Sequence, residues 1–246
     1  MLVSPSWAKQ FPQLIIGQTT RNGGVSQVPY KSFNLGLFTQ DKYDSVQENR
    51  RRLANYVGIS VENWAGGHQV HGSAVRLVKS PMACEGYDAF ITTVSGVLLT
   101  VTVADCIPVL LYDPVSNSCG AAHAGWRGTV ANIVGKTLQA MVEQFSVAPE
   151  NCYAYVGTSI SQPNFEVSHD VAEQFLPHLV NGGFPNDKFR VDLHQANVDQ
   201  LTAAGCKPEN LEVSPFCTVD DNDRFFSYRK EKGTTGRMLA VIGLKK

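Results

Sequence analysis

The sequence predicts a single α/β or α+β domain that spans residues 1–246. Three observations favour this fold class. Strand-like and helix-like segments alternate irregularly along the chain. A length of 246 residues suits one large domain or at most two small ones. No internal repeat, low-complexity segment or Pro/Gly/Ser-rich linker divides the chain.

Two segments give the strongest signals. Residues 97–103 are almost wholly apolar and rich in β-branched side chains, which predicts a strand buried on both faces. After Gly128, apolar residues recur at helical spacing from Val130 to Phe145, which predicts a long amphipathic helix. An earlier helix is predicted over 44–57, where Ser45 and Glu48 have capping-box spacing and Gly58 follows as a stop.

The remaining elements are shorter. We expect strands over 109–112, 119–122 and 153–157, helices over 168–179 and 192–204, and closing strands over 225–228 and 238–244.

Composition limits the classes of partner. The chain is 43% hydrophobic and 17% charged, with a formal net charge of -1, so no bulk field attracts nucleic acid or a membrane surface. No window reaches the roughly 18 unbroken apolar residues of a membrane span. The first residues lack the basic and apolar regions of a secretory signal, and we therefore expect a cytoplasmic protein. We also expect a monomer or a weak homo-oligomer. The six cysteines form no C-x-x-C pair, which favours free thiols over disulfides.

Three polar stretches are not explained by helices and strands. They are Gln69–Gly72, Ala104–Pro108 and Ala121–Gly128, and they contain His71, Cys106 and His123. Two imidazoles and a thiolate are good zinc donors, and three protein ligands leave a fourth position for water or substrate. The spacing follows no standard motif, so other interpretations stay open. His71 would then be a loop histidine, Cys106 a small buried residue or a nucleophile activated by His123, and His123 a helix cap.

Several charged residues have two interpretations at this stage. The Arg50–Arg52 triplet is either a solvated helix face or contains one arginine that turns inward to an anion. Arg127 stands beside a predicted helix N-terminus, where free N–H groups favour an anion such as phosphate. His68 either lines the same cleft as His71 or decorates a loop.

At these stretches the chain closely resembles the laccase-domain family. This family is also called multicopper polyphenol oxidase-like, and it includes peptidoglycan editing factors and FAMIN-like purine nucleoside phosphorylases. The resemblance covers almost the whole chain. It rests on Thr19–Arg21 with Gly23–Ser26, Phe33–Gly36, Glu48–Arg50, Gln69–Gly72, Ala104–Cys106 with Pro108–Leu110, His123–Gly128, Phe165–Val167, Cys217–Thr218, Phe226–Arg229 and Thr235–Arg237.

The resemblance implies a fold, a metal and a reaction. The fold is a single domain of mixed β-sheets flanked by helices, the laccase-domain (CNF/YfiH-like) fold. The ligands of a Zn²⁺ cofactor are His71, Cys106 and His123, with copper as the alternative metal. The activity is phosphorolysis of adenosine, inosine, guanosine and methylthioadenosine, together with adenosine deamination at the same site.

From the chemistry of this reaction we hypothesise roles for individual residues. Asp105, Cys106 and His123 are expected to be catalytic, although Asp105 equally suits a residue that holds a local turn. Phosphate is expected near Arg50 or Arg127, and Arg229 and Arg237 are expected to be anion contacts or surface salt-bridge partners. The expected substrate contacts are Asn34, Arg50, Gln69, Arg127 and Arg229.

Two departures from the family pattern concern specificity. The chain reads Gly157-Thr158-Ser159-Ile160-Ser161 where the family often has Gly-Pro-x-Ile-Gly, and His68 precedes Gln69. Both changes would alter the polarity or shape of a substrate cleft.

Three other functions remain open. The first is a copper oxidase of phenols, which six scattered histidines argue against because multicopper sites need many imidazoles. The second is a cysteine hydrolase that uses Cys106, on muropeptides or peptidoglycan precursors. The third is a metal-stabilised binding protein without turnover.

Overall fold

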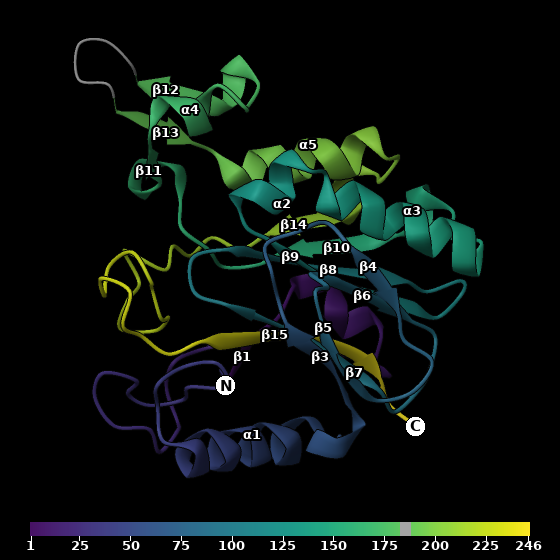
Figure 1. Cartoon of the computed structure of the whole chain (residues 1–246). Coiled ribbons are helices and arrows are strands. Elements are labelled where there is room, and N and C mark those ends of the chain that lie inside the picture. Colours follow the sequence, from purple (N-terminus) through teal and green to yellow (C-terminus); the bar gives the residue numbers. More distant parts are fainter. Residues whose placement is uncertain (183–187) are drawn as a thin grey trace.

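The structure is a computed structural model that describes residues 1–182 and 188–246, and it is built in four layers (Figure 1). Helix α1 (Tyr43–Val57) covers one six-stranded sheet. That sheet faces a second six-stranded sheet, which is covered by α2 (Trp126–Val130), α3 (Ile133–Phe145) and α5 (Leu193–Ala203). The predicted class of mixed sheets flanked by helices is confirmed.

The first sheet combines both ends of the chain with its middle. In spatial order its strands are β1 (Leu2–Val3), β2 (Leu14–Thr19), β15 (Met238–Leu244), β7 (Leu98–Val103), β3 (Trp64–His68) and β5 (Met82–Glu85). The strands β15 and β7 pair antiparallel, whereas β3 pairs parallel with both β7 and β5. The predicted strands over 97–103 and 238–244 are confirmed.

The second sheet carries the long hairpin of the molecule. Its strands, in spatial order, are β14 (Leu211–Val213), β10 (Tyr153–Val156), β8 (Ile107–Asp113), β9 (Ser118–Ala124), β6 (Ala89–Thr92) and β4 (Val75–Leu77). Both strands of the hairpin, β8 and β9, are buried along their full length and are longer than the sequence predicts. A smaller sheet of β11 (Glu166–Val167), β13 (Phe189–Val191) and β12 (Val180–Gly182) lies beside α4 (His169–Ala172) at one end of the molecule (Figure 1).

Three apolar clusters hold the layers together. One lies between the two large sheets and combines Leu99 and Ile242 with Leu110 and Tyr155. A second packs α3 and α5 on the outer face of the second sheet, and a third packs Leu53 of α1 on the first sheet. Burial of apolar surface is the dominant stabilising term in folding, so the sheets must stack in this order to cover every apolar face.

Several element predictions need correction. The helix predicted from Val130 starts at Ile133, because Asn132 has a left-handed φ of 57° and its side chain accepts a hydrogen bond from Gly135 N. The helix predicted over 168–179 is reduced to α4 and a 3-10 turn at Pro177–Leu179, since proline cannot continue a helix.

The strand predicted over 225–228 is also wrong. That stretch is irregular, and Phe225 and Phe226 are instead fully buried against Met238 and Val103. At α1 the expected capping box does not form, because the helix starts at Tyr43 and Glu48 pairs with Arg51 and Arg52.

The state of the cysteines and the apolar character of the helices bear on two further predictions. All six cysteines are free, as expected. No helix within residues 1–182 and 188–246 has the length and apolar character that crossing a bilayer requires.

Asn34 joins three parts of the chain in front of the first sheet. Its side-chain oxygen accepts hydrogen bonds from Gly36 N (3.1 Å) and Arg237 N (2.8 Å). Its side-chain nitrogen donates to Thr39 Oγ1 and Asp41 Oδ2. The residue has no exposed surface. It therefore fixes the loop after β2 against the start of β15 and leaves no side-chain group free.

We predict that Asn34→Ala lowers the free energy of unfolding by about 2–4 kcal/mol, because two backbone N–H groups lose their acceptor in a buried place. Urea denaturation followed by circular dichroism measures the change. Asn22→Ala is the control, since Asn22 is exposed and makes one bond to Asp223 O. Equal stability of the two variants would contradict the assigned role of Asn34.

Candidate metal centre and active site

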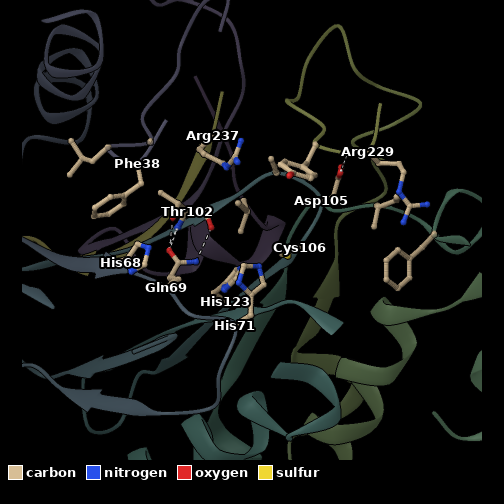
Figure 2. Close-up of a pocket in the computed structure, with 17 residues that line it drawn as sticks. Phe38, His68, Gln69, His71, Thr102, Asp105, Cys106, His123, Arg229 and Arg237 are labelled. Carbon is tan, nitrogen blue, oxygen red and sulfur yellow. Dashed lines mark hydrogen bonds between the residues drawn. The ribbon is translucent and has the colours of Figure 1, made fainter. Parts of the chain in front are cut away.

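His71, Cys106 and His123 converge in the folded chain. One nitrogen of each histidine and the sulfur of Cys106 all lie within 4.8 Å of one another. The two imidazole rings stand at 77° to each other with centroids 4.8 Å apart. Figure 2 shows the three side chains together on the floor of a cavity. Residues far apart in sequence therefore form one potential ligand set.

The hairpin register explains how Cys106 and His123 meet. In the β8–β9 ladder, Pro108 pairs with His123 and Ile107 pairs with Ala124. Cys106 directly precedes Ile107, so its side chain lies beside that of His123. The turn that delivers it from β7 contains Asp105 at φ 85°, a left-handed backbone that non-glycine residues rarely adopt.

Asp88 positions both histidines. Its Oδ1 lies 2.8 Å from His123 Nδ1 and accepts a hydrogen bond from His71 N at 2.9 Å. Its Oδ2 accepts from Val70 N and Gly72 N. When Asp88 accepts a hydrogen bond from Nδ1–H of the neutral imidazole, Nε2 of His123 has a free lone pair for a metal. The sequence prediction did not include Asp88. Its position directly before the buried strand β6 is the signal that could have indicated a site residue.

Burial and neighbouring charges shift the pKa values of Cys106 and His123 in opposite directions. Burial raises the pKa of the Cys106 thiol, but interactions with His123 and His71 outweigh it and bring the pKa to about 6. Burial lowers the pKa of His123, but the Cys106 thiolate and Asp88 outweigh it and raise that pKa. A thiolate is the form of cysteine that binds metal.

Gly125 lets the ligands approach. A Cβ atom built at this position would lie 2.9 Å from His71 Cδ2 and 3.1 Å from Cys106 Sγ. Any side chain at Gly125, the first residue of the G-W-R-G stretch, would therefore press against His71 and Cys106.

The cluster opens into a cavity of about 510 Å³. His123 is buried, Cys106 is partly exposed and His71 is exposed, so the ligand set faces the cavity from its floor. The walls come from the segments Gly36–Phe38, His68–Gln69 and Thr102–Asp105 and from residues of the second half of the chain, namely Ile160, Phe165, Tyr228, Arg229 and Arg237.

Gln69 and Asp105 both line the cavity but are held by other residues. Gln69 Nε2 donates to Thr102 O, and its Oε1 accepts from Thr102 N and Oγ1, which fixes the His71 loop to β7 (Figure 2). Asp105 Oδ1 accepts from Thr218 Oγ1 at 2.5 Å and its Oδ2 accepts from Arg229 N at 2.6 Å. Its carboxylate thus joins the turn between β7 and β8 to Thr218 and Arg229, which are distant in sequence, rather than holding a local turn, and it stands at the edge of the cavity.

Arg229 and Arg237 line the cavity without a carboxylate partner among residues 1–182 and 188–246. Arg229 donates to Asn164 O and Glu166 O, and Arg237 Nη1 donates to Thr235 O and Gly236 O. Burial lowers the pKa of Arg237. Within the described part of the chain, the salt-bridge interpretation of these two arginines does not apply.

Three of the expected substrate contacts lie elsewhere. Asn34 is buried behind the cavity wall and fully hydrogen-bonded. Arg127 is exposed on α2, over the ring of Trp126, and does not line the cavity. Arg50 lines an adjoining cavity of about 590 Å³, where it stacks on Trp64 and burial lowers its pKa to about 10.

Comparison with known proteins assigns the family. The sequence profile of the family described as "Multi-copper polyphenol oxidoreductase laccase" matches residues 15–245. The chain belongs to this family. The predicted resemblance to laccase-domain proteins is therefore confirmed.

Several relatives in the family carry names that state an activity. "Purine nucleoside phosphorylase" of Deinococcus radiodurans is 41% identical over 92% of this chain and 87% of its own length. "Purine nucleoside phosphorylase YfiH" of Escherichia coli is 36% identical over 99% of this chain and 98% of its own length. The crystal structure of YlmD from Geobacillus stearothermophilus has a TM-score of 0.90 at 34% identity, covering 96% of this chain and 93% of that one.

We predict that Asp88→Ala weakens zinc binding roughly 10- to 100-fold, the usual loss when a carboxylate partner of a metal-binding histidine is removed. Competition with a chromophoric chelator measures the affinity. Asp113→Ala is the matched control, because Asp113 is also buried and holds the turn at the far end of the same hairpin through Val115 N and Ser116 N. Equal zinc affinity in the two variants would contradict the role of Asp88.

Proposed function

We propose that this protein is a zinc-dependent purine nucleoside phosphorylase that also deaminates adenosine. The observation that carries the proposal is the His71–Cys106–His123 cluster on the floor of a cavity whose wall contains Arg229 and Arg237. The substrates would be adenosine, inosine, guanosine and methylthioadenosine. The names of the relatives support the phosphorylase activity, and the resemblance to the family is the basis for the deaminase activity and the substrate range.

The donor set fits zinc. Imidazole nitrogen and thiolate sulfur are the ligands of catalytic zinc, and three of them leave one position open. His71 is exposed to the cavity, so the open position would face the substrate. When bound, zinc supplies Lewis-acid polarisation or an activated water, and deamination of adenosine requires such a water.

The chain's own residues would supply the rest of the chemistry. Phosphorolysis breaks the bond between the sugar C1′ and the base nitrogen while phosphate attacks C1′, and positive charge develops on the sugar as in glycoside cleavage. Arg229 and Arg237 would hold the phosphate, since they line the cavity and have donors free of carboxylates. This placement replaces Arg127, which does not line the cavity.

Among residues 1–182 and 188–246, Asp105 is the carboxylate that lines the cavity, and it is our candidate for the general acid or base. It stands next to Cys106 in the chain and contacts Arg229 N. Its two hydrogen bonds would hold it at a fixed place while the base departs.

One observation favours a second function, a cysteine hydrolase. Cys106 faces two imidazoles and its pKa is lowered to about 6, which are also the conditions that activate a nucleophilic thiol. Alkylation of Cys106 in the metal-free protein, followed by assays on peptides and muropeptides, tests this. A copper oxidase would need additional ligands, and the cluster contains two of the six histidines.

We predict that the purified protein releases adenine from adenosine only when phosphate is present, and that inosine forms without phosphate. Chromatography of the products checks both reactions. Cys106→Ala should contain no zinc by elemental analysis and should lose both activities, whereas Cys84→Ala, a partly exposed thiol of β5, should keep them. A wild-type protein that holds no zinc and forms neither product would overturn the proposal, and substrate binding without turnover would favour a binding protein.

We predict that Arg229→Ala raises the KM for phosphate roughly 10- to 100-fold, since hydrogen bonds to charged groups contribute about 1.5–3 kcal/mol. The KM for adenosine should change by less than about 3-fold, because the two substrates would occupy different parts of the cavity. Arg190→Ala is the control, as Arg190 is an exposed arginine on β13 that does not line the cavity. The assignment fails if both variants keep the wild-type KM for phosphate.

A further inference from the structure

Exposed apolar side chains gather at the cavity. Leu37, Phe38 and Tyr228 are 46%, 65% and 52% exposed, and all three line its walls. An exposed large apolar group beside a cavity, rather than scattered over the surface, marks a place where a ligand is covered. Phe38 is the most exposed of the three and also lines the adjoining cavity.

The position of Phe38 is fixed without burial of its ring. It belongs to the loop that Asn34 anchors, where Thr39 Oγ1 also donates to Gly36 O at 3.1 Å. Gly36 lies against the side chain of Arg237, since a Cβ built there would be 2.7 Å from Arg237 Cγ. The loop is therefore held in place on both sides of Phe38, whose ring lines the cavity.

His68 completes an aromatic wall. Its ring lies edge-to-face with Phe38, with centroids 4.7 Å apart and planes at 67°. His68 ends β3 and lines both cavities, so the interpretation that it shares a cleft with His71 agrees with its position. The two rings thus form one surface, contributed by two segments about 30 residues apart in sequence.

The two ends of the cavity differ in charge, since the guanidinium of Arg229 lies at the end away from Phe38 and His68. Figure 2 shows Phe38 and His68 at one end, Arg229 at the opposite end, and His71, Cys106 and His123 between them. A nucleoside and a phosphate present three parts in a similar order: a flat base, the sugar carbon where the bond breaks, and an anion. If the anion lies at Arg229, the base lies at the end formed by Phe38 and His68.

We propose that Phe38, supported by His68, is the stacking platform for the purine ring. This inference rests on the proposed function and names the part of the cavity that recognises the base. Every purine has a π-face, so stacking would accept adenine, hypoxanthine and guanine alike. A smaller pyrimidine ring would cover less of the platform, and we expect weaker binding of pyrimidine nucleosides.

Three substitutions at Phe38 separate stacking from simple burial. Phe38→Ala and Phe38→Leu should each raise the KM for adenosine roughly 10-fold, within the range found when an aromatic partner of a base is removed. Phe38→Tyr, which keeps the ring, should stay within about twofold of the wild type. The KM for phosphate and the zinc content should not change in any of them. Tyr56→Ala, an exposed aromatic residue of α1 that does not line the cavity, is the control.

Binding of adenine to the zinc-loaded protein, measured by calorimetry without phosphate, gives a readout that does not depend on turnover. Adenine affinity should fall in Phe38→Ala and Phe38→Leu and persist in Phe38→Tyr. If the wild type cleaves adenosine but Phe38→Leu keeps the wild-type KM and adenine affinity, the stacking role is wrong and the proposed function stands. If the wild type neither cleaves adenosine nor binds adenine, both are overturned.

Discussion

The candidate site depends on one buried carboxylate. Asp88 is fully buried and accepts hydrogen bonds from three consecutive backbone N–H groups, at Val70, His71 and Gly72, while it also holds the His123 ring. A buried charge is costly unless it is fully hydrogen-bonded, and here every partner belongs to a segment that carries a ligand. The same interaction that compensates the carboxylate therefore joins the loop after β3 to the strand β9.

This constraint explains why the ligand set belongs to the fold rather than to a local motif. His71 comes from a loop of the first sheet, whereas His123 and Cys106 come from the hairpin of the second sheet. Stacking of the two sheets brings these elements to one edge, and Asp88 fixes their relative position there. Loosening either sheet would separate the three side chains. The geometry of the site at this edge therefore depends on the stability of the core.

The sequence predicted the convergence of His71, Cys106 and His123 better than the residues that support it. His71, Cys106 and His123 stood out because polar residues at strand ends have no structural explanation, and the family resemblance joined them. Asp88 could not be found from periodicity, since its role follows from contacts with residues 16–18 positions earlier and 35 positions later. The strand and helix interiors were predictable from apolar spacing. The segment 225–228 was not, because buried aromatic residues in an irregular loop have the same composition as a strand.

The expected arginines show a second limit of sequence reasoning. Arg127 stands four residues after His123 in the chain, yet its side chain is exposed on α2 over Trp126 and does not line the cavity. Arg237 is more than 110 residues from His123, yet the pairing of β15 with β7 places it on the cavity wall. Sequence distance from the ligands therefore says little about which cation faces the substrate.

The two alternatives for Cys106 are a metal ligand and a nucleophile, and both use its sulfur. A thiolate between two imidazoles suits either a metal ligand or an activated nucleophile, and coordination to a metal would draw electron density from the sulfur and weaken it as a nucleophile. The surroundings favour the ligand. Asp88 takes the Nδ1 side of His123 and so directs its other nitrogen toward the cluster, while Gly125 leaves room for His71 and Cys106 to approach each other. A hydrolase needs one imidazole near the thiol, whereas two imidazoles, both positioned through Asp88, suit a set of three donors that share an ion.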